Sequence, residues 1–385
     1  MFKTTAFIMS LITAFSLYFG TAGSPDYTKS FTFNNMVEAF INKNDIIGNS
    51  YTGQASSEKW SETDVYSLDD TSILIKDKDK DFIILNLSDI HFTDYDKKST
   101  AVPNTIANIR KIVATVRPDL ITVTGDIVCS DSTYYSVRLF TDLMESFGIP
   151  WAPVFGNHDG EGNCDLNYLA DIMMTSPHCL LKKGDPDLGI GNYIINIAEE
   201  NEDGSLKIIE SVIMLFSHNH VNNEKQLRWY KWAADGVNKL SGNSAEISIF
   251  CHIPLPEYQY AYDIAWDDEK NQWHQGYGAY GALGENVAYG TVENGIPSQK
   301  DFFSILKETG TAKYVFCGHD HLNNFSILYQ GIRLTYSMKI GAASGNFFMF
   351  NGGTEITVGN RGITSIRQKS LALGPVITLY DIDTK

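Results

Sequence analysis

Apolar runs separated by helical patterns organise the first part of the chain. Residues 82–85, 120–124 and 149–155 are rich in β-branched and aliphatic side chains and predict buried strands. Between these strands, apolar residues recur at helical spacing in residues 104–116 and 134–147. The order strand, helix, strand, helix, strand predicts an α/β fold, in which ligands bind beyond the carboxyl ends of the strands.

The second part of the chain has a more antiparallel pattern. The stretch 256–295 is rich in Gly, Tyr and Trp, and we expect a long loop there of the kind that carries function. Ahead of residue 82, the charged run 76–81 is expected to be a solvated hairpin turn. The remaining elements predicted are strands at 73–75, 193–197, 208–216, 246–251, 313–317, 331–336 and 362–366 and helices at 225–240 and 297–308.

The composition fits a packed globular domain and excludes one class of partner. The 385 residues carry a formal net charge of -16, and 43% of them are hydrophobic. We expect no nucleic-acid-binding surface, because such surfaces hold phosphates with a surplus of Lys and Arg. An anionic substrate would therefore need a local positive centre, which a bound metal would supply.

The first residues have the pattern of an export signal. Lys3 is basic, residues 6–19 are apolar and uncharged, and small residues follow. The alternative, an uncleaved membrane anchor, needs about 18 apolar residues, and this run is shorter. No later segment is apolar enough to span a membrane, so we expect a secreted protein or one in the lumen of the secretory pathway or periplasm. The expected divisions are a signal peptide at 1–23, a polar extension with a strand at 24–81 and the main domain at 82–385.

The five cysteines do not form a disulfide framework. Cys164 and Cys179 flank one loop–helix segment and are the candidates for a disulfide if the protein is exported. The sequons at Asn86 and Asn324 lie in strand-like or site-proximal stretches, and we interpret both as chance matches. The other cysteines are expected to be buried thiols beside strand ends.

Side chains that bind metals follow five of the predicted strands. Asp89 and His91 come just after the first buried strand, and we expect them to share one face of an extended segment. Each such residue alone has an ordinary explanation as a turn or cap residue. Five blocks together indicate one shared site, since carboxylates with imidazoles suit a hard or borderline metal ion. The blocks are Asp89 with His91, Asp126, Asn157 with His158, His252, and His319 with His321.

This series resembles the calcineurin-like metallophosphoesterases. The resemblance covers residues 82–321 and implies a four-layer α/β/β/α sandwich of two mixed sheets flanked by helices, with two metal ions at the strand ends. Part of the motif sequence is similar to that of phosphatases named as purple acid phosphatases. The matching motifs are Asp-x-His at 89–91, Gly-Asp at 125–126, Gly-Asn-His-Asp at 156–159, His252, and Gly-His-x-His at 318–321.

The resemblance implies a role for each motif residue. Two metals about 3.5–4 Å apart can activate one water, and the resulting hydroxide would attack phosphorus in line with the leaving oxygen. His158 would be the catalytic residue that stabilises phosphoryl charge or protonates the leaving group. Asp159 would either orient a neighbouring imidazole or serve as a loop or helix-start residue. The implied metal ligands are Asp89, His91 and His321 for the first ion, Asn157, His252 and His319 for the second, and Asp126 as the bridge.

Departures from the purple acid enzymes narrow the expected site. Those enzymes have a tyrosine iron ligand three residues after the bridging aspartate, where this chain has Cys129. They also lack the histidine of the Asp-x-His motif, which is His91 in this chain. We therefore expect a colourless dinuclear site that holds Mn, Fe or Zn, which mixed nitrogen and oxygen ligands do not distinguish. His218 and His220 stand outside the motifs and are expected to be loop or supporting residues rather than direct ligands.

The expected activity is metal-dependent hydrolysis of a phosphomonoester, with a phosphorylated small molecule or a phosphoprotein as substrate. A phosphodiesterase, similar to exported acid-sphingomyelinase-like enzymes, is the alternative, because loops set the specificity. A third hypothesis is a metal-binding module without catalysis. The presence of His158 argues against it.

Overall fold

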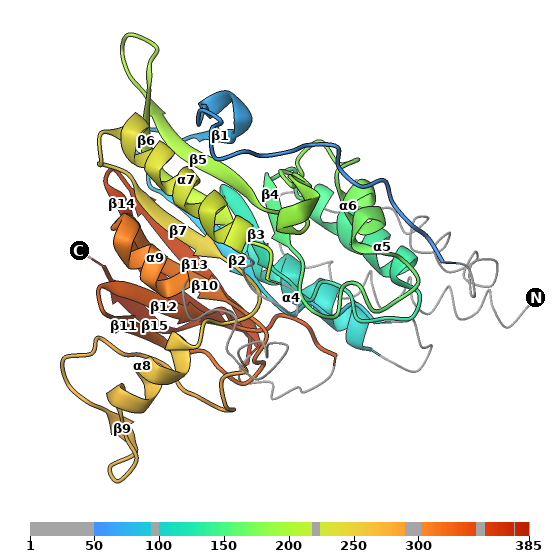
Figure 1. Cartoon of the computed structure of the whole chain (residues 1–385). Helices are drawn as coiled ribbons and strands as arrows, with labels where there is room; N and C mark the ends of the chain where they lie inside the picture. The colour runs from blue at the N-terminus through green and yellow to red at the C-terminus, as the bar shows by residue number, and fades with distance from the viewer. Residues whose placement is uncertain are drawn as a thin grey trace, which may run out of the picture.

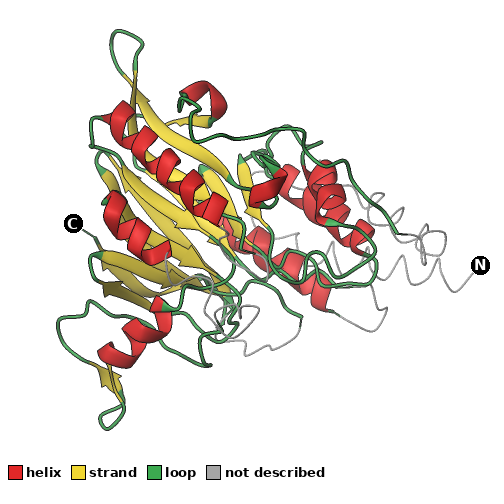
Figure 2. Ribbon diagram, viewed as in Figure 1, coloured by secondary structure: helices red, strands yellow, loops and turns green. Residues whose placement is uncertain are grey.

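The structure is a computed structural model, and it describes residues 50–93, 100–217, 224–288, 302–343, 351–372 and 374–384. Two mixed β-sheets pack face to face, and helices cover the outer face of each (Figures 1 and 2). The expected four-layer α/β/β/α sandwich is therefore confirmed.

One sheet has six strands and carries the first part of the predicted β-α-β-α-β unit. Its order from edge to edge is β15 (Ile377–Asp383), β14 (Gly362–Ser370), β13 (Gly352–Gly359), β2 (Phe82–Leu87), β3 (Leu120–Thr124) and β4 (Trp151–Val154). The neighbours β2, β3 and β4 are parallel, whereas β13, β14 and β15 pair antiparallel. The helices on this side are α4 (Ala101–Val116), α5 (Thr133–Glu145) and α6 (Leu166–Met173).

The other sheet has seven strands. Its order is β1 (Ser72–Ile75), β5 (Tyr193–Glu200), β6 (Leu206–Met214), β7 (Glu246–Phe250), β10 (Ala312–Cys317), β12 (Ile332–Tyr336) and β11 (Ser326–Tyr329). The helices α7 (Glu224–Ser241) and α9 (Phe302–Thr309) contact β6 and β10, and α8 (Glu257–Ala265) contacts β11. Of two short helical turns, η1 (Leu68–Asp70) contacts β1 and η2 (Pro186–Leu188) contacts α7.

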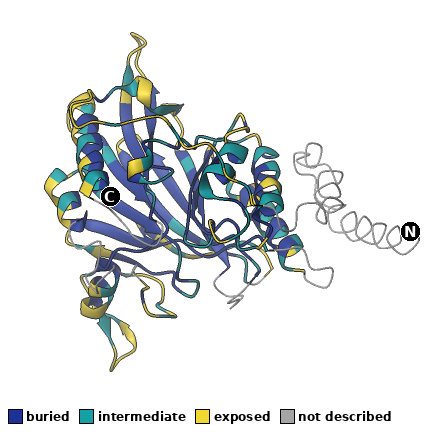
Figure 3. Ribbon diagram, turned by 45° about the vertical axis from the view of Figure 1, so that its right-hand side comes forward, coloured by how far each residue is buried: buried dark blue, intermediate teal, exposed yellow. Residues whose placement is uncertain are grey.

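Apolar side chains fill the space on both faces of these sheets. Phe250 of β7 stacks on Phe316 of β10 with ring centroids 4.8 Å apart, in the same buried cluster as Ile84 of β2. A second cluster packs the seven-stranded sheet against its helices, where Tyr230 of α7 meets Phe302 of α9. Figure 3 shows the strands buried along most of their length. Coverage of both faces explains why the strands read as continuous apolar runs.

The helix α4 shows how local sequence sets the ends of an element. Pro103 lies in its first turn, where the missing backbone N–H removes no helical hydrogen bond. At the other end Arg117 adopts the left-handed conformation, with φ 54°, and its N–H donates to the carbonyl of Val113. Pro118 then prevents further helix. The helix therefore delivers the chain directly into β3.

Three expectations from the sequence are wrong. The run 76–81 is not a hairpin, because β1 and β2 belong to different sheets, and Lys76 is buried against Glu199 with an N–O distance of 2.9 Å. The stretch 256–295 is not a simple loop, since it contains α8 and the hairpin of β8 (Trp266–Asp267) with β9 (Gln272–Trp273). Cys164 and Cys179 are free thiols rather than a disulfide.

Other expectations are met or lie outside the described residues. Asn86 and Asn324 are buried, as expected of sequons that are chance matches. The expected signal peptide at 1–23 and the pair His218 and His220 lie outside the described residues. Within the described ranges, no helix combines the length and the hydropathy that crossing a membrane requires.

Candidate metal centre

All five motif blocks lie just past the carboxyl ends of strands, and the two sheets bring them together. Since β2, β3 and β4 are parallel neighbours, Asp89, Asp126 and Asn157 emerge from the same edge of the six-stranded sheet. The strands β7 and β10 are parallel neighbours in the other sheet, and they lead to His252 and to His319 with His321. The chain thus builds one site from both sheets.

The backbone at the site is held in an uncommon conformation. Asp89, His91, Asp126 and His319 have φ values of 51°, 49°, 50° and 76°. These values fall in the left-handed region, which costs energy for residues other than glycine. Hydrogen bonds between the loops stabilise this backbone conformation. One of them runs from the N–H of His91 to the carbonyl of Asp126, at 2.9 Å. The tight turns aim the side chains inward at the strand ends.

Two motif glycines permit these loops to approach one another. A Cβ atom on Gly156 would collide with the carboxylate and backbone of Asp126. A Cβ on Gly318 would collide with Ser88 and lie 2.7 Å from the carboxylate of Asp89. The glycines are therefore required by close packing around the two carboxylates.

The first cluster of donor atoms comprises Asp89, His91 and His321. The Nε2 atoms of His91 and His321 lie 3.1 Å apart. Oδ1 of Asp89 lies 3.8 Å from Nε2 of His91 and 3.6 Å from Nε2 of His321. The backbone N–H of His319 donates to the carboxylate of Asp89 and holds it in place.

The second cluster comprises Asp126, His252 and His319, with Asn157 beside them. Nε2 of His252 lies 3.0 Å from Oδ1 of Asn157 and 3.3 Å from Nδ1 of His319. Oδ2 of Asp126 lies 3.3 Å from Nε2 of His252 and 3.5 Å from Nε2 of His91. Asp126 therefore lies between the two clusters.

The spacing of these donors fits a pair of metal ions. Ligands that lie about 2.1 Å from one ion are separated from each other by roughly 3.0–3.4 Å. The distances in the second cluster fall in this range, and those in the first are close to it. Imidazole nitrogens and carboxylate oxygens are ligands that transition metals prefer.

The electrostatics of the cluster also favour cations. Burial would raise the pKa of Asp89, yet His321 and His91 hold it well below its usual range. Against the effect of its own burial, His252 has a pKa raised to about 10 by Asp126. Burial and the charge of His252 lower the pKa of His319 to about 4. A site that must retain a proton on an imidazole to balance its carboxylates is one that a metal cation would stabilise.

His158 lies beside the clusters but has a different partner. Its Nδ1 lies 2.7 Å from Oε2 of Glu161, and its Nε2 lies 4.0 Å from Oδ2 of Asp126. Against the lowering effect of partial burial, the hydrogen bond with Glu161 raises the pKa of His158. The side chain is 36% exposed, whereas those of His91 and His252 are 2% and 0% exposed. His158 is thus the more accessible proton donor.

Asp159 is fully buried and binds backbone groups. Its Oδ1 accepts hydrogen bonds from the N–H groups of Ile127 and Val128, and its Oδ2 accepts one from Gly156. Burial and the nearby Asp126 raise the pKa of Asp159 to about 7. The carboxyl group ties the loop after β3 to the loop after β4, and so it fixes where Asp126 and His158 lie.

Besides Glu161, three supporting residues belong to none of the motifs. Ser217 accepts the backbone N–H of His252 at 2.8 Å, and Ser88 donates to Oδ2 of Asp89 at 2.6 Å. Lys339 is buried, with its Nζ 3.2 Å from Nδ1 of His321, and burial lowers the pKa of Lys339 to about 8. Adjacency to Asp89 could have identified Ser88, whereas nothing in the sequence connects Ser217 or Lys339 to the motifs.

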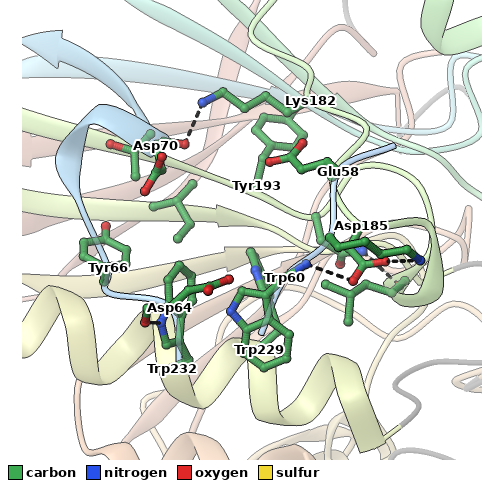
Figure 4. Close-up of a pocket in the computed structure, with 16 residues that line it drawn as sticks. Glu58, Trp60, Asp64, Tyr66, Asp70, Lys182, Asp185, Tyr193, Trp229 and Trp232 are labelled. Atoms are coloured by element: carbon green, nitrogen blue, oxygen red, sulfur yellow. Dashed lines mark hydrogen bonds and ion pairs between the residues drawn. The ribbon is translucent and has the colours of Figure 1, made fainter. Parts of the chain in front are cut away.

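A separate pocket of about 300 Å³ lies between residues 58–71 and α7 (Figure 4). Aromatic side chains, among them Trp60 and Trp232, line it. Asp185 in its wall accepts hydrogen bonds from the backbone N–H of Trp60 and from Lys225, and Nε1 of Trp232 donates to the carbonyl of Asp64. These contacts fasten the segment before β1 to α7. The residues lining this pocket include none of the donors of the metal centre.

Comparison with known proteins bears on the whole arrangement. The model of the calcineurin-like phosphoesterase family matches residues 82–323. The "Probable inactive purple acid phosphatase 14" of Arabidopsis thaliana is 27% identical over 304 residues, which covers 68% of this chain and 70% of that protein. "Phosphatase DCR2" of Saccharomyces cerevisiae is 26% identical over 276 residues, covering 64% and 45% respectively. A dimetal phosphatase from Danio rerio aligns with a TM-score of 0.47 and 10% identity over 78% of this chain and 98% of that one.

Proposed function

Because the chain belongs to the calcineurin-like phosphoesterase family, we propose that it is a dinuclear-metal-dependent phosphoric ester hydrolase that acts on phosphomonoesters. Asp89, His91 and His321 would hold one metal ion, and Asn157, His252 and His319 the other. Asp126 would bind both, which its distances of 3.5 Å and 3.3 Å to the imidazoles of His91 and His252 support.

The chemistry follows from these donors and from His158. Bound metal ions supply positive charge that polarises the phosphoryl oxygens and the attacking water. His158 faces the same cluster with Nε2, while its Nδ1 donates to Glu161. Its raised pKa favours the protonated imidazole, which could give a proton from Nε2 to the leaving oxygen.

The observation that carries this proposal is the presence of His158 beside a complete donor set. The relative from Arabidopsis thaliana carries the word inactive in its name. That name supports a second candidate function, a metal-binding protein without catalysis. An accessible imidazole held by a carboxylate favours the hydrolase, because titratable groups with shifted pKa values cluster at catalytic sites.

Substitution of the shared ligand tests the proposal. In Asp126→Asn, we expect kcat/KM for an aryl phosphate to fall at least about a thousandfold, or ~4 kcal/mol, because both metal ions lose a carboxylate. The exposed Asp81→Asn, at the start of the same sheet, is the matched control and should keep full activity. Circular dichroism verifies that both variants are folded. Retention of most of the activity by Asp126→Asn would contradict the proposal.

A substrate panel distinguishes the remaining candidates. We expect faster hydrolysis of an aryl phosphomonoester than of the matching diester, and the reverse order would identify a phosphodiesterase. Metal bound in stoichiometric amount without hydrolysis of any ester would identify the non-catalytic alternative. We propose phosphorylated small molecules or phosphoproteins as substrates, and Mn, Fe or Zn as the metals, which elemental analysis of the purified protein would name.

We also propose that the protein is exported after removal of residues 1–23, and that residues 24–81 form an extension of the domain at 82–385. N-terminal sequencing of the protein recovered from the producing cells tests this division. A mature chain that begins near residue 24 is expected, and one that retains Met1 would contradict it.

A further inference from the structure

The pocket beside α7 has an aromatic side and an acidic side (Figure 4). The indoles of Trp60, Trp229 and Trp232 lie together next to the helix, and Glu58 and Asp70 lie on the opposite side. The volume of about 300 Å³ is at the lower end of the range for small-molecule sites in proteins. The pocket therefore has the size and the mixed lining of a site for a small ligand.

The aromatic side offers ring surface rather than polar groups. Nε1 of Trp232 donates to the carbonyl of Asp64, and the hydroxyl of Tyr66 accepts a hydrogen bond from Asn196. The ring of Trp232 meets those of Trp60 and Tyr66 at interplanar angles of 65° and 64°, with centroids 5.9 Å and 5.4 Å apart. Rings at these angles form the walls of a box, whereas a sugar ring stacks on a flat aromatic platform.

The acidic side is only partly balanced by positive charge. Asp185 is neutralised by Lys225 at 2.6 Å and by Lys59 at 3.2 Å. Lys182 also lines the pocket, and its Nζ donates to a backbone carbonyl, that of Asp70, at 2.7 Å. The lining carboxylates that form no ion pair among the described residues are those of Glu58, Asp64 and Asp70. Three carboxylates and one ammonium leave the pocket negative, which favours a cationic ligand.

Trp60 adds a requirement for the ligand. Its Nε1 is buried and has no hydrogen-bond partner in the part of the chain that the structure describes. Its backbone N–H donates to Oδ2 of Asp185 at 3.1 Å, which holds the residue in the wall. A buried donor without a partner costs free energy, and an acceptor on a ligand would recover it. An oxygen near the cationic group of the ligand would serve as that acceptor.

We propose that this pocket binds a small quaternary ammonium compound that carries a hydroxyl oxygen close to its charge. Indole faces attract cations, and Trp does so more strongly than Tyr or Phe. A metal ion would need oxygen ligands on several sides, which the aromatic side does not supply. A methylated nitrogen has no N–H groups to satisfy, so ring surface suits it better than it suits a primary ammonium. The pocket shares no residue with the metal centre, so the inference is independent of the proposed function.

Calorimetric titration of the purified protein with choline tests the inference. We expect one saturable binding event with a dissociation constant on the order of 1 mM. The neutral carbon isostere of choline has the same shape without the charge, and it should bind at least about tenfold more weakly. Ethanolamine, which keeps the charge and the hydroxyl but not the methyl groups, should also bind more weakly. Methyl glucoside should not bind.

Substitutions in the two walls locate the binding event. The double variant Glu58→Gln with Asp70→Asn removes two exposed charges, and Trp60→Leu removes one indole. Each should weaken choline binding by about fivefold or more. Glu202→Gln, on the exposed turn between β5 and β6, changes the net charge at a distance and should leave the affinity unchanged. Circular dichroism verifies that the variants are folded.

Four outcomes would overturn the inference. The first is the lack of saturable choline binding by the unsubstituted protein. Equal affinity for choline and its neutral isostere would identify an ordinary apolar pocket. Binding of methyl glucoside in place of choline would identify a saccharide site. Choline binding that both the charge variant and Trp60→Leu leave unchanged would show that choline binds elsewhere on the protein.

Discussion

At the scale of single residues, the acid-base behaviour of His158 depends on its neighbour Glu161. The two side chains are joined by a bond of 2.7 Å, and this bond raises the pKa of His158 against the effect of partial burial. If His158 is the proton donor, activity is present while the imidazole is protonated and is lost as the pH rises through that pKa.

Glu161→Gln should therefore move the alkaline limb of the pH profile of kcat/KM to lower pH. Loss of the carboxylate removes the interaction that raises the pKa of His158. His158→Ala should lower kcat by about 10²–10⁴-fold with the fold retained. The exposed Glu200→Gln serves as a control whose profile should match the unsubstituted enzyme. An unmoved alkaline limb in Glu161→Gln would mean that another group donates the proton.

Asp159→Asn should destabilise the protein by about 1–3 kcal/mol. Asn has one oxygen, whereas the two oxygens of Asp159 accept three backbone N–H groups, so at least one buried donor loses its partner. Urea unfolding measures the loss. Asp81→Asn, whose side chain is exposed, should change the free energy of unfolding little. Equal stability of the two variants would show that the loops do not depend on Asp159.

The site residues that the sequence predicts lie at strand ends, whereas those that it misses reach the site only through the packing of loops. The motif residues stand at strand ends, and parallel strands bring their ends to one edge, so Asp89, Asp126 and Asn157 could be placed together from pattern alone. Lys339 lies 18 residues beyond its partner His321 in a stretch without a motif. Only the packing of the loop after β12 against the loop after β2 makes it part of the site.

At the scale of the elements, β6 and β7 carry an acidic pair away from the metal centre. Glu210 is fully buried, and its Oε1 accepts a hydrogen bond from Ser248. Its Oε2 has no hydrogen-bond partner among the described residues. Burial raises the pKa of Glu210 to about 8, and the neighbouring Glu246 acts in the same direction. The folded protein therefore holds a protonated carboxyl group between the strands.

This pair predicts how stability changes with pH. The unfolded chain loses the proton of Glu210 near its ordinary value of 4.5, and the folded chain loses it near 8. The contribution of Glu210 to the free energy of unfolding is therefore fully present below about pH 4.5. It is lost as the pH rises toward 8, at up to ~1.4 kcal/mol per pH unit. Glu210→Gln should flatten this slope in urea unfolding, whereas the exposed Glu202→Gln should not. A slope that persists in Glu210→Gln would contradict the assignment.

The elements themselves were predictable where one period dominates. The helix α4 and the strands β2 and β3 follow from clear apolar spacing. The sequence pattern does not predict the helix α8, because Tyr, Trp and Gly residues surround it. Only three apolar residues of this helix, Tyr258, Ala261 and Ala265, are buried. The position of Lys76 was misjudged because its partner Glu199 lies on a strand that is 123 residues away.

At the scale of the whole molecule, the metal centre joins two sheets. Asp89, Asp126 and Asn157 follow strands of the six-stranded sheet, while His252 and His319 follow strands of the other. Metal ions held by both groups would therefore oppose separation of the sheets, and stability would depend on metal concentration.

Removal of metal should lower the melting temperature, and its return should restore it. Metal at 100 times its dissociation constant adds ~2.7 kcal/mol to the free energy of unfolding. Thermal unfolding with and without a chelator measures the change. Asp126→Asn is the control, since its melting temperature should respond less to the chelator. A melting temperature that is independent of metal in the unsubstituted chain would show that the centre does not hold the sheets.

The exposed turn between β5 and β6, at residues 201–205, lies between two groups of metal-centre residues along the chain. Cutting there would give one fragment with Asp89, His91, Asp126 and Asn157 and another with His252, His319 and His321. Each sheet contains strands from both fragments, so neither half can complete a sheet or a metal site alone. The fold is thus laid out for fragment complementation, in which tight metal binding would report that the two halves have reassembled.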